Sequence, residues 1–211
     1  MSEWHCDVLG LRLQRVLREL GPVLCGQGAY LAGGTALALH LGHRVSVDLD
    51  FFQNSSFGDP HELVEQIKQA GVPFQSRQLT DKAIHGTARQ VKVTLMWYAY
   101  LRIRRVRCCP ELNCDIAALD DLAAMKLAAV CQRSSKKDFV DVWALLKSGR
   151  SLRSMLTAYQ RTFDVADVAH VLYRLADFDE VDRQSMPRMR WKTSWKQMKD
   201  DLSRSLKSLR T

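Results

Sequence analysis

Residues 31–52 of this 211-residue chain read Leu-Ala-Gly-Gly-Thr-Ala-Leu-Ala-Leu-His-Leu-Gly-His-Arg-Val-Ser-Val-Asp-Leu-Asp-Phe-Phe. Two glycines and a hydroxyl residue, Gly33, Gly34 and Thr35, precede an apolar run that is typical of a helix. Glycines let the backbone approach a phosphate closely, and Thr35 is expected to cap the helix. Because the first N–H groups of a helix are unpaired and its dipole favours an anion, these residues predict a phosphate-binding turn.

The end of the same stretch carries two aspartates, Asp48 and Asp50, in a run with the character of a strand, residues 45–52. Side chains two residues apart leave the same face of a strand, so the two carboxylates are expected to form a pair. Mg²⁺ binds through one or two carboxylates together with substrate phosphates. The stretch therefore predicts nucleotide chemistry, with Mg²⁺ held by Asp48 and Asp50.

Each of these features alone has an ordinary explanation, as a surface strand or as a turn with a helix cap. Their combination, one short helix apart and followed by Phe51-Phe52, is more specific. It resembles the first motif of polymerase-β-like nucleotidyltransferases, and most of all the AbiEii/AbiGii toxin branch. That branch reads Gly-Gly-Thr/Ser, a helix, His/Gly-Arg and Asp-x-Asp-Phe, and Arg44 and Ser46 match positions that it tends to fill.

Residues 120–146 hold a second group of polar residues and read as two helices broken near Ser134-Ser135. Lys126 lies among small apolar residues of the first helix, with Arg133 seven positions further on. Asp138 and Asp141 lie three apart on the second helix, and they could orient Lys126, complete a metal site or accept a proton. An alternative for Asp138 is a capping box with Ser135, whereas Asp141 lies past the first turn.

The toxin branch also shows a helical lysine, a basic residue and Arg/Lys-Asp-x-x-Asp-Leu, which Lys126, Arg133 and residues 137–142 resemble in that order. The resemblance covers roughly residues 30–147. It implies that Gly33, Gly34, Thr35, Arg44, Ser46 and Arg133 bind the nucleotide and that Asp48, Asp50, Lys126, Asp138 and Asp141 are catalytic. One departure is Thr94, at the expected position of a third carboxylate on the strand over residues 91–97.

The remaining pattern predicts helices over residues 6–20, 35–41 and 61–70 and strands over 45–52, 74–79 and 91–97, with 101–107 as a further strand candidate. Residues 23–32 are expected to lead into a short strand that ends at Gly33. Gly21-Pro22 is expected to end the first helix. Residues 115–209 predict four or five helices. The fold class is therefore α+β: a polymerase-β-like core of a mixed sheet flanked by helices, followed by a C-terminal helical region. We expect a nucleotidyltransferase core over residues 1–113 and a helical domain over 114–211 that completes the active-site cleft.

The net charge of +8 predicts a polyanionic partner, although a solvated basic face would explain it equally well. Residues 186–211 hold eight basic residues against two acidic ones, and residues 102–107 hold four arginines. An apolar stripe from Trp191 to Leu209 predicts an amphipathic helix that docks on the protein's own body or on a partner. The chain has no run of eighteen apolar residues, no signal-like start and six cysteines that suit free thiols, so we expect a cytoplasmic protein that takes no membrane partner.

These observations together predict a Mg²⁺-dependent nucleotidyltransferase that uses a nucleoside triphosphate, with RNA as its acceptor. Family resemblance implies a toxin of a toxin-antitoxin system that adds nucleotides to the 3′ end of tRNA and is neutralised by a cognate antitoxin protein. Two alternatives remain open at this stage. The acceptor could be a hydroxyl of a protein or a small molecule, or the chain could be a non-catalytic RNA- or protein-binding module with a degenerate pocket.

Overall fold

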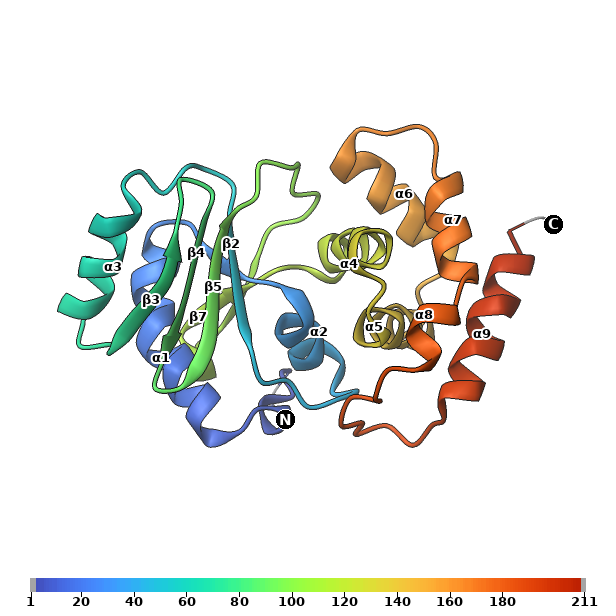
Figure 1. Ribbon diagram of the computed structural model, residues 1–211, viewed down its shortest axis with the longest axis horizontal. Helices are drawn as coiled ribbons and strands as arrows, with labels where there is room; N and C mark the ends of the chain where they lie inside the picture. The colour runs from blue at the N-terminus through green and yellow to red at the C-terminus, as the bar shows by residue number, and fades with distance from the viewer. Residues whose placement is uncertain (1–2, 210–211) are drawn as a thin grey trace.

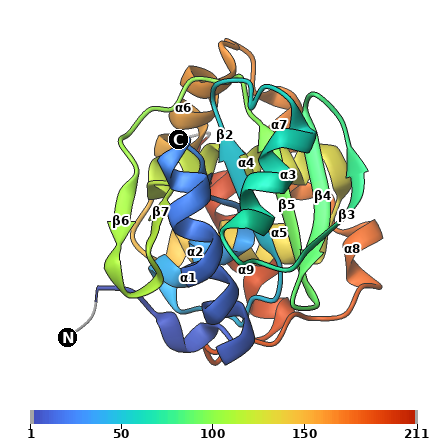
Figure 2. The same ribbon diagram turned by 90° about the vertical axis from the view of Figure 1, so that its left-hand side faces the viewer.

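The computed structural model describes residues 3–209, in which a sheet-containing half is joined to a helical half (Figure 1). Helices α1 (Leu11–Gly26) and α3 (Pro60–Gln69) cover the outer face of the sheet. Figure 2 shows the same two helices in front of the strands, which run from β3 on one side to β6 on the other. Helix α2 (Gly33–Leu41) lies on the opposite face, toward the helical half.

Within residues 3–209 a single mixed sheet has the strand order β3-β4-β5-β2-β1-β7-β6. Strand β2 pairs parallel with β5 and antiparallel with β1, and β1 pairs parallel with β7. The register of β2 and β5 places Asp50 opposite Thr94. The strands are β1 (Tyr30–Leu31), β2 (Leu49–Gln53), β3 (Phe74–Leu79), β4 (Ala83–Ala88), β5 (Val91–Trp97), β6 (Arg107–Cys109) and β7 (Cys114–Ile116).

The helical half is built around α4, which packs against α2 on the sheet side and against α5, α6 and α7 within its own half. Short 3₁₀ helices at Cys6–Val8 and Pro110–Leu112 belong to the sheet side. One continuous apolar core spans both halves. The helices are α4 (Leu119–Arg133), α5 (Lys136–Lys147), α6 (Leu152–Phe163), α7 (Ala169–Ala176), α8 (Asp179–Asp182) and α9 (Trp195–Lys207).

The mixed sheet with helices on both faces confirms the α+β fold class, and the break between α4 and α5 lies where the sequence predicts it. The prediction that Gly21-Pro22 ends the first helix is wrong, because α1 continues to Gly26. A proline inside a helix costs about 3 kcal/mol, but Leu20 and Leu24 bury the same face before and after it. Burial of that face outweighs the lost hydrogen bond.

Strand β4 is the element that the sequence pattern does not reveal, because Gly86 interrupts it. A Cβ on Gly86 would lie 2.6 Å from the carbonyl oxygen of Gln75 and would also meet the ring of Phe74. The glycine is therefore a packing requirement of the β3–β4 pair rather than a turn. Strand β7 likewise lies just beyond the expected boundary at residue 113, so the sheet extends to Ile116. Residues 1–2 and 210–211, which end the two expected domains, lie outside the described residues.

The predicted amphipathic helix docks on the protein's own body. Met198 and Leu202 of α9 are fully buried, and α9 packs against α5 and α7. Trp191 belongs to the extended segment before the helix rather than to the helix itself. Among the described residues, no helix is both long enough and apolar enough to cross a membrane.

Candidate active site

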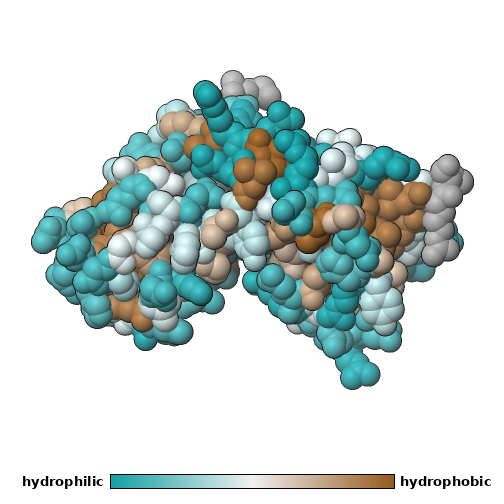
Figure 3. All heavy atoms as spheres, turned by 90° about the horizontal axis from the view of Figure 1, so that it is seen from above, coloured by the Kyte–Doolittle hydropathy of each residue, from teal (hydrophilic) through white to brown (hydrophobic). Residues whose placement is uncertain are grey.

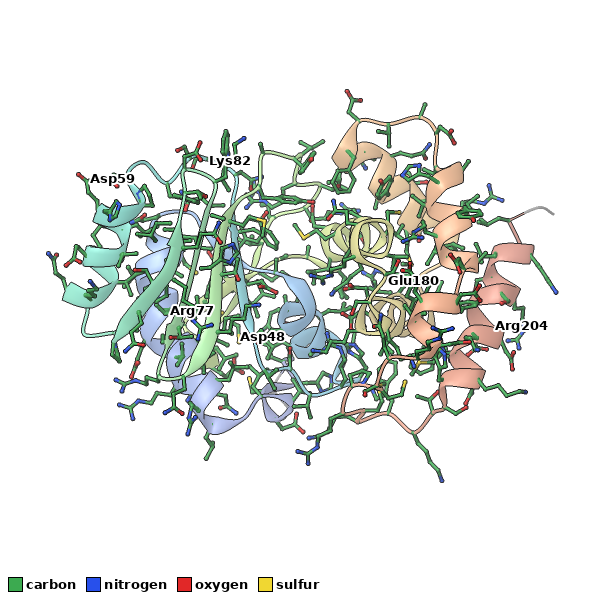
Figure 4. The ribbon with its side chains drawn as sticks, in the orientation of Figure 1. Asp48, Asp59, Arg77, Lys82, Glu180 and Arg204 are labelled. Carbon is green, nitrogen blue, oxygen red and sulfur yellow. The ribbon has the colours of Figure 1, made fainter. Side chains whose placement is uncertain are left out.

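A cleft of about 480 Å³ opens between the two halves and is lined from both of them. It is formed by the start of α2, the turn between α2 and β2, strands β2 and β5, the α4–α5 junction and residues 187–188. The space-filling view from above shows a deep notch between the halves (Figure 3). In Figure 4, Asp48 lies in the middle of the molecule beside α2. The residues predicted as the site line this cleft, except Gly33, which is next to the lining residue Gly34, and Asp141, which is fully buried.

Thr35 does not cap α2, contrary to the prediction. The helix begins at Gly33, and its N-cap, Ala32, makes no side-chain cap bond. The Thr35 hydroxyl instead donates to the backbone carbonyl of Asp48 and accepts from the hydroxyl of Ser46 at 2.7 Å. Thr35 lies within the first turn, where its side chain is directed at the turn after α2. It ties the backbone of Asp48 to the start of α2.

The two glycines are required by close approach of charged side chains. Gly33 has a φ of +64°, and a Cβ there would lie 2.7 Å from Oδ2 of Asp50. A Cβ on Gly34 would overlap the guanidinium of Arg44. The start of α2, with its unpaired N–H groups, is therefore in contact with the predicted metal-binding carboxylate and with a cation.

The carboxylates of Asp48 and Asp50 line the cleft without internal partners. Among the described residues neither one has a hydrogen bond or an ion pair. Burial raises the pKa of Asp50, and the charge of Asp48 raises it further, against the opposing charge of Lys126. Two adjacent carboxylates that make no ion pair with a described residue fit a divalent ion, which binds through one or two carboxylates and substrate phosphates.

Asp141 is fully buried and is surrounded by cations from both halves. It accepts hydrogen bonds from Nε2 of His43 at 2.8 Å and from Nε and Nη2 of Arg44 at 2.7 and 2.9 Å. Its other neighbour is Nζ of Lys126 at 2.6 Å. Burial raises the pKa of Asp141, but the charges of Arg44 and Lys126 outweigh burial and hold it well below its usual value.

Asp138 belongs to the same buried cluster. Its carboxylate accepts from Nζ of Lys126 at 3.0 Å and from Nε and Nη2 of Arg133 at 2.7 and 3.0 Å. Burial raises its pKa, but Lys126 and Arg133 lower it further than burial raises it. The capping-box alternative is wrong, because Ser135 makes no side-chain cap bond and the carboxylate of Asp138 is directed at α4. We call Arg44, Lys126, Asp138 and Asp141 the buried charge cluster, which the exposed Arg133 joins from the solvent side.

His43 also belongs to this site, although the sequence pattern indicates it only as part of the His/Gly-Arg motif. Its Nε2 donates to Asp141, while its buried Nδ1 has no hydrogen-bond partner among the described residues. Burial lowers the pKa of His43, and the hydrogen bond to Asp141 opposes this without reversing it. The position of Thr94 is as expected, opposite Asp50, and its hydroxyl lies 3.4 Å from Nδ1 of His85. Three further cations of the cleft, Lys92, Lys137 and Arg188, were not predicted.

The fold matches that of solved nucleotidyltransferase structures. A candidate nucleotidyltransferase from H. pylori aligns with a TM-score of 0.58 and 17% identity, over 93% of this chain and 93% of that one. MenT4, a nucleotidyltransferase toxin from Mycobacterium tuberculosis, aligns with a TM-score of 0.51 and 13% identity, over 92% of this chain and 81% of that one. At these identities the likeness establishes the fold.

The family follows from sequence. The model of the family described as nucleotidyl transferase AbiEii toxin, Type IV TA system, matches residues 15–107 and 99–210. An uncharacterized protein of Aquifex aeolicus (strain VF5) is 31% identical over 157 residues, which are 72% of this chain and 74% of that protein. The chain belongs to the AbiEii family of nucleotidyltransferase toxins. This confirms the resemblance drawn from residues 31–52 and the expectation of an enzyme.

Proposed function

We propose that this chain transfers a nucleoside monophosphate from a nucleoside triphosphate to the 3′ end of tRNA in the cytoplasm, with Mg²⁺ as cofactor. A cognate antitoxin protein, the partner that the family name implies, neutralises it. The observation that carries the proposal is the cleft itself. One wall holds a helix start in contact with an unpaired carboxylate pair, and the other holds buried cations.

The phosphates of the nucleotide bind at the start of α2 in this proposal. The backbone N–H groups of Gly33, Gly34 and Thr35 lie in the first turn, where no helix carbonyl can pair with them. Asp48 and Asp50 hold the Mg²⁺. When bound there, the metal ion supplies positive charge between the carboxylates and the phosphate oxygens. Thr35 and Ser46 fix the backbone that carries Asp48.

Lys126 offsets the charge that develops as pyrophosphate leaves. An ammonium group has three N–H donors, and Asp138 and Asp141 occupy two of those of Lys126. The third remains for a phosphate oxygen in the cleft. Arg133, whose side chain is 63% exposed, can reach the same phosphates while it pairs with Asp138. Fixed cations of this kind supply most of the stabilisation in phosphoryl-type transfer.

Asp138 and Asp141 position these cations in our proposal and do not take the proton of the acceptor. A general base works best with a pKa near the operating pH. Both carboxylates have lowered pKa values, and each bonds to at least two cationic side chains. Of the roles that the sequence allows them, orientation of Lys126 is the one that the contacts favour.

RNA is the acceptor that the charge distribution favours. The net charge is +8, and most of the basic residues of α9 are exposed while its apolar stripe is buried. Exposed lysines and arginines neutralise a phosphate backbone and release its counterions. A cationic small molecule would be repelled by the same surface.

The test is incubation with each radiolabelled nucleoside triphosphate in turn, with Mg²⁺ and total cellular RNA. Label in a tRNA-sized band supports the proposal. Label in protein, or in a small-molecule acceptor that is added separately, moves the acceptor to another class. Absence of label with all four nucleotides indicates a binding module. The Asp50→Asn variant serves as the negative control in each incubation.

A further inference from the structure

The segment between α8 and α9, residues 183–194, runs back from the helical half to the turn between α2 and β2; we call it the return segment. The N–H of Val45 donates to the carbonyl of Arg188 at 2.9 Å. The N–H groups of Arg190 and Trp191 donate to the carbonyl of His43 at 2.9 and 3.2 Å. Figure 1 shows this segment along the lower edge of the molecule, beside the α2–β2 turn.

Aromatic packing fixes the segment as well. The ring of Trp191 lies edge-on to that of His43 and to that of Trp143, with centroids 5.9 Å apart in both cases. His43 in turn bonds to Asp141, so the segment rests directly on the buried charge cluster. A segment held by three backbone hydrogen bonds and by a tryptophan has a defined position at the cleft.

Arg188 lines the cleft as a result, although it lies far from the other site residues in sequence. Its side chain is exposed and has no hydrogen bond or ion pair with any described residue. The same is true of Lys92 on β5 and Lys137 at the start of α5, which line the same cleft. Three separate elements thus bring unpaired cations to one opening.

These cations differ from those of the buried charge cluster. Arg44 and Lys126 are almost completely buried, and their charges face Asp138 and Asp141. They are partly neutralised before any ligand arrives. None of the outer three makes an ion pair with a described carboxylate, although the charge of Lys92 also acts on Asp50. Their charge therefore remains available to an anion at the mouth of the cleft.

We propose that Arg188, Lys92 and Lys137 form an outer phosphate-binding site, distinct from the start of α2. The inference rests on the proposed function and specifies how that cleft holds its ligand. The ligand chemistry is phosphate, either the terminal phosphates of the nucleotide or a phosphodiester of the acceptor RNA. Arginine suits either source because its planar guanidinium binds two phosphate oxygens at once.

The experiment measures binding and not turnover. The full chain and its Arg188→Ala variant are titrated with a non-hydrolysable nucleoside triphosphate in Mg²⁺, and separately with fluorescently labelled tRNA. Lys192→Ala is the matched control, since Lys192 is an exposed cation of the same segment that does not line the cleft. Arg188→Lys keeps the charge but loses the planar guanidinium, so it is expected to restore only part of the affinity.

The expected result is that Arg188→Ala raises the Kd of one ligand about tenfold, as loss of one charge-assisted contact of about 1.4 kcal/mol would. Lys192→Ala should stay within about twofold of the unaltered chain. Weakening of the triphosphate alone assigns the site to the nucleotide, and weakening of tRNA alone assigns it to the acceptor. Arg188→Ala with both Kd values unchanged would overturn the proposal.

Failure of this inference is distinguishable from failure of the proposed function. If tRNA becomes labelled but Arg188→Ala binds both ligands normally, the outer site is wrong and the function stands. If no acceptor is ever labelled but Arg188→Ala weakens binding of inorganic triphosphate, the outer site is supported and the proposed function is wrong. The unfolding temperatures of all variants are measured first, and they should agree because the replaced side chains have no internal partners.

Discussion

Two pairs of aspartates with the same chemistry have opposite surroundings in this protein. Asp48 and Asp50 lack hydrogen-bond and ion-pair partners among the described residues, and burial raises the pKa of Asp50. Asp138 and Asp141 bond to lysine, arginine and histidine side chains, and their pKa values are lowered. The charge of Asp50 therefore disfavours the folded state and the first pair is available to a ligand, whereas the charges of the second pair stabilise the fold and are already matched by cations.

The difference separates residues that bind from residues that position. Spacing alone does not make that distinction, because the members of each pair lie only two or three residues apart in the sequence. Whether an aspartate binds a ligand or positions a cation depends on how many cations the tertiary contacts bring within bonding distance of it. Substitutions in the two aspartate pairs test this difference.

The largest expected effect is on turnover in Asp50→Asn and Asp48→Asn. Loss of a metal-binding carboxylate should lower kcat about 10³-fold or more, equivalent to about 4 kcal/mol of transition-state stabilisation. The unfolding temperature of Asp50→Asn should stay the same or rise, because an unpaired, partly buried charge is removed. Labelled-nucleotide incorporation and thermal unfolding measure the two quantities. Full turnover in either variant would disprove the metal assignment.

Asp141→Asn should show the reverse pattern, with the main effect on stability. Removing the charge of Asp141 leaves the buried Arg44 without its ion pair and Lys126 with Asp138 as its remaining one, and costs about 3–5 kcal/mol. The free energy of unfolding, from urea titration, should fall by that amount. If Asp141→Asn were as stable as the unaltered chain and only its turnover fell, Asp141 would be a catalytic group and the contrast would fail.

The pH dependence of stability should differ between the two pairs. Lowered pKa values mean that Asp138 and Asp141 contribute stability above the ordinary carboxyl pKa of 3.8, and that this is lost as pH falls below it. The raised pKa of Asp50 has the opposite sign, because its protonation favours the folded state as pH falls. In urea titrations from pH 7 to pH 3, the free energy of unfolding should therefore fall more steeply on acidification in Asp50→Asn and less steeply in Asp141→Asn.

The smallest expected effect is that of Thr35→Val, which keeps the shape of the side chain. It removes the hydrogen bonds to Asp48 and Ser46 and should lower stability by about 1–3 kcal/mol, with a modest loss of turnover. Ser46→Ala removes only one of the two bonds and should have less effect. Equal activity in Thr35→Val and the unaltered chain would show that the position of Asp48 does not depend on this link.

The parts of the site that the sequence reveals are those whose members are neighbours along the chain. Asp48, Asp50 and the glycine pair share one short stretch, and Lys126, Asp138 and Asp141 share another. The order of these motifs was also enough to identify the family. Thr35 shows the limit of local reasoning, because a hydroxyl next to a helix start can bond to a distant backbone as readily as to its own helix.

The parts that could not be predicted depend on contacts between distant segments. Arg188 reaches the cleft only because backbone hydrogen bonds hold residues 183–194 against the α2–β2 turn. Strand β4 can hold Gly86 because the ring of Phe74 and the backbone of Gln75 fill the space of a side chain there, a contact that the sequence does not reveal. Helix α1 continues through Gly21-Pro22 because Leu20 and Leu24 are buried. A prediction that proline ends a helix does not take this burial into account.

Asp141 lies on α5, while His43 and Arg44 lie in the turn between α2 and β2, so one buried carboxylate fastens the two halves to each other. A hinge rotation that separates the two halves would expose the carboxylate of Asp141 and remove it from His43 and Arg44, while Lys126 would stay beside it. In the proposed function the nucleotide would therefore enter a cleft whose charges are already assembled. Rigidity of this kind means that the dipoles and ions need little rearrangement when bond breaking begins.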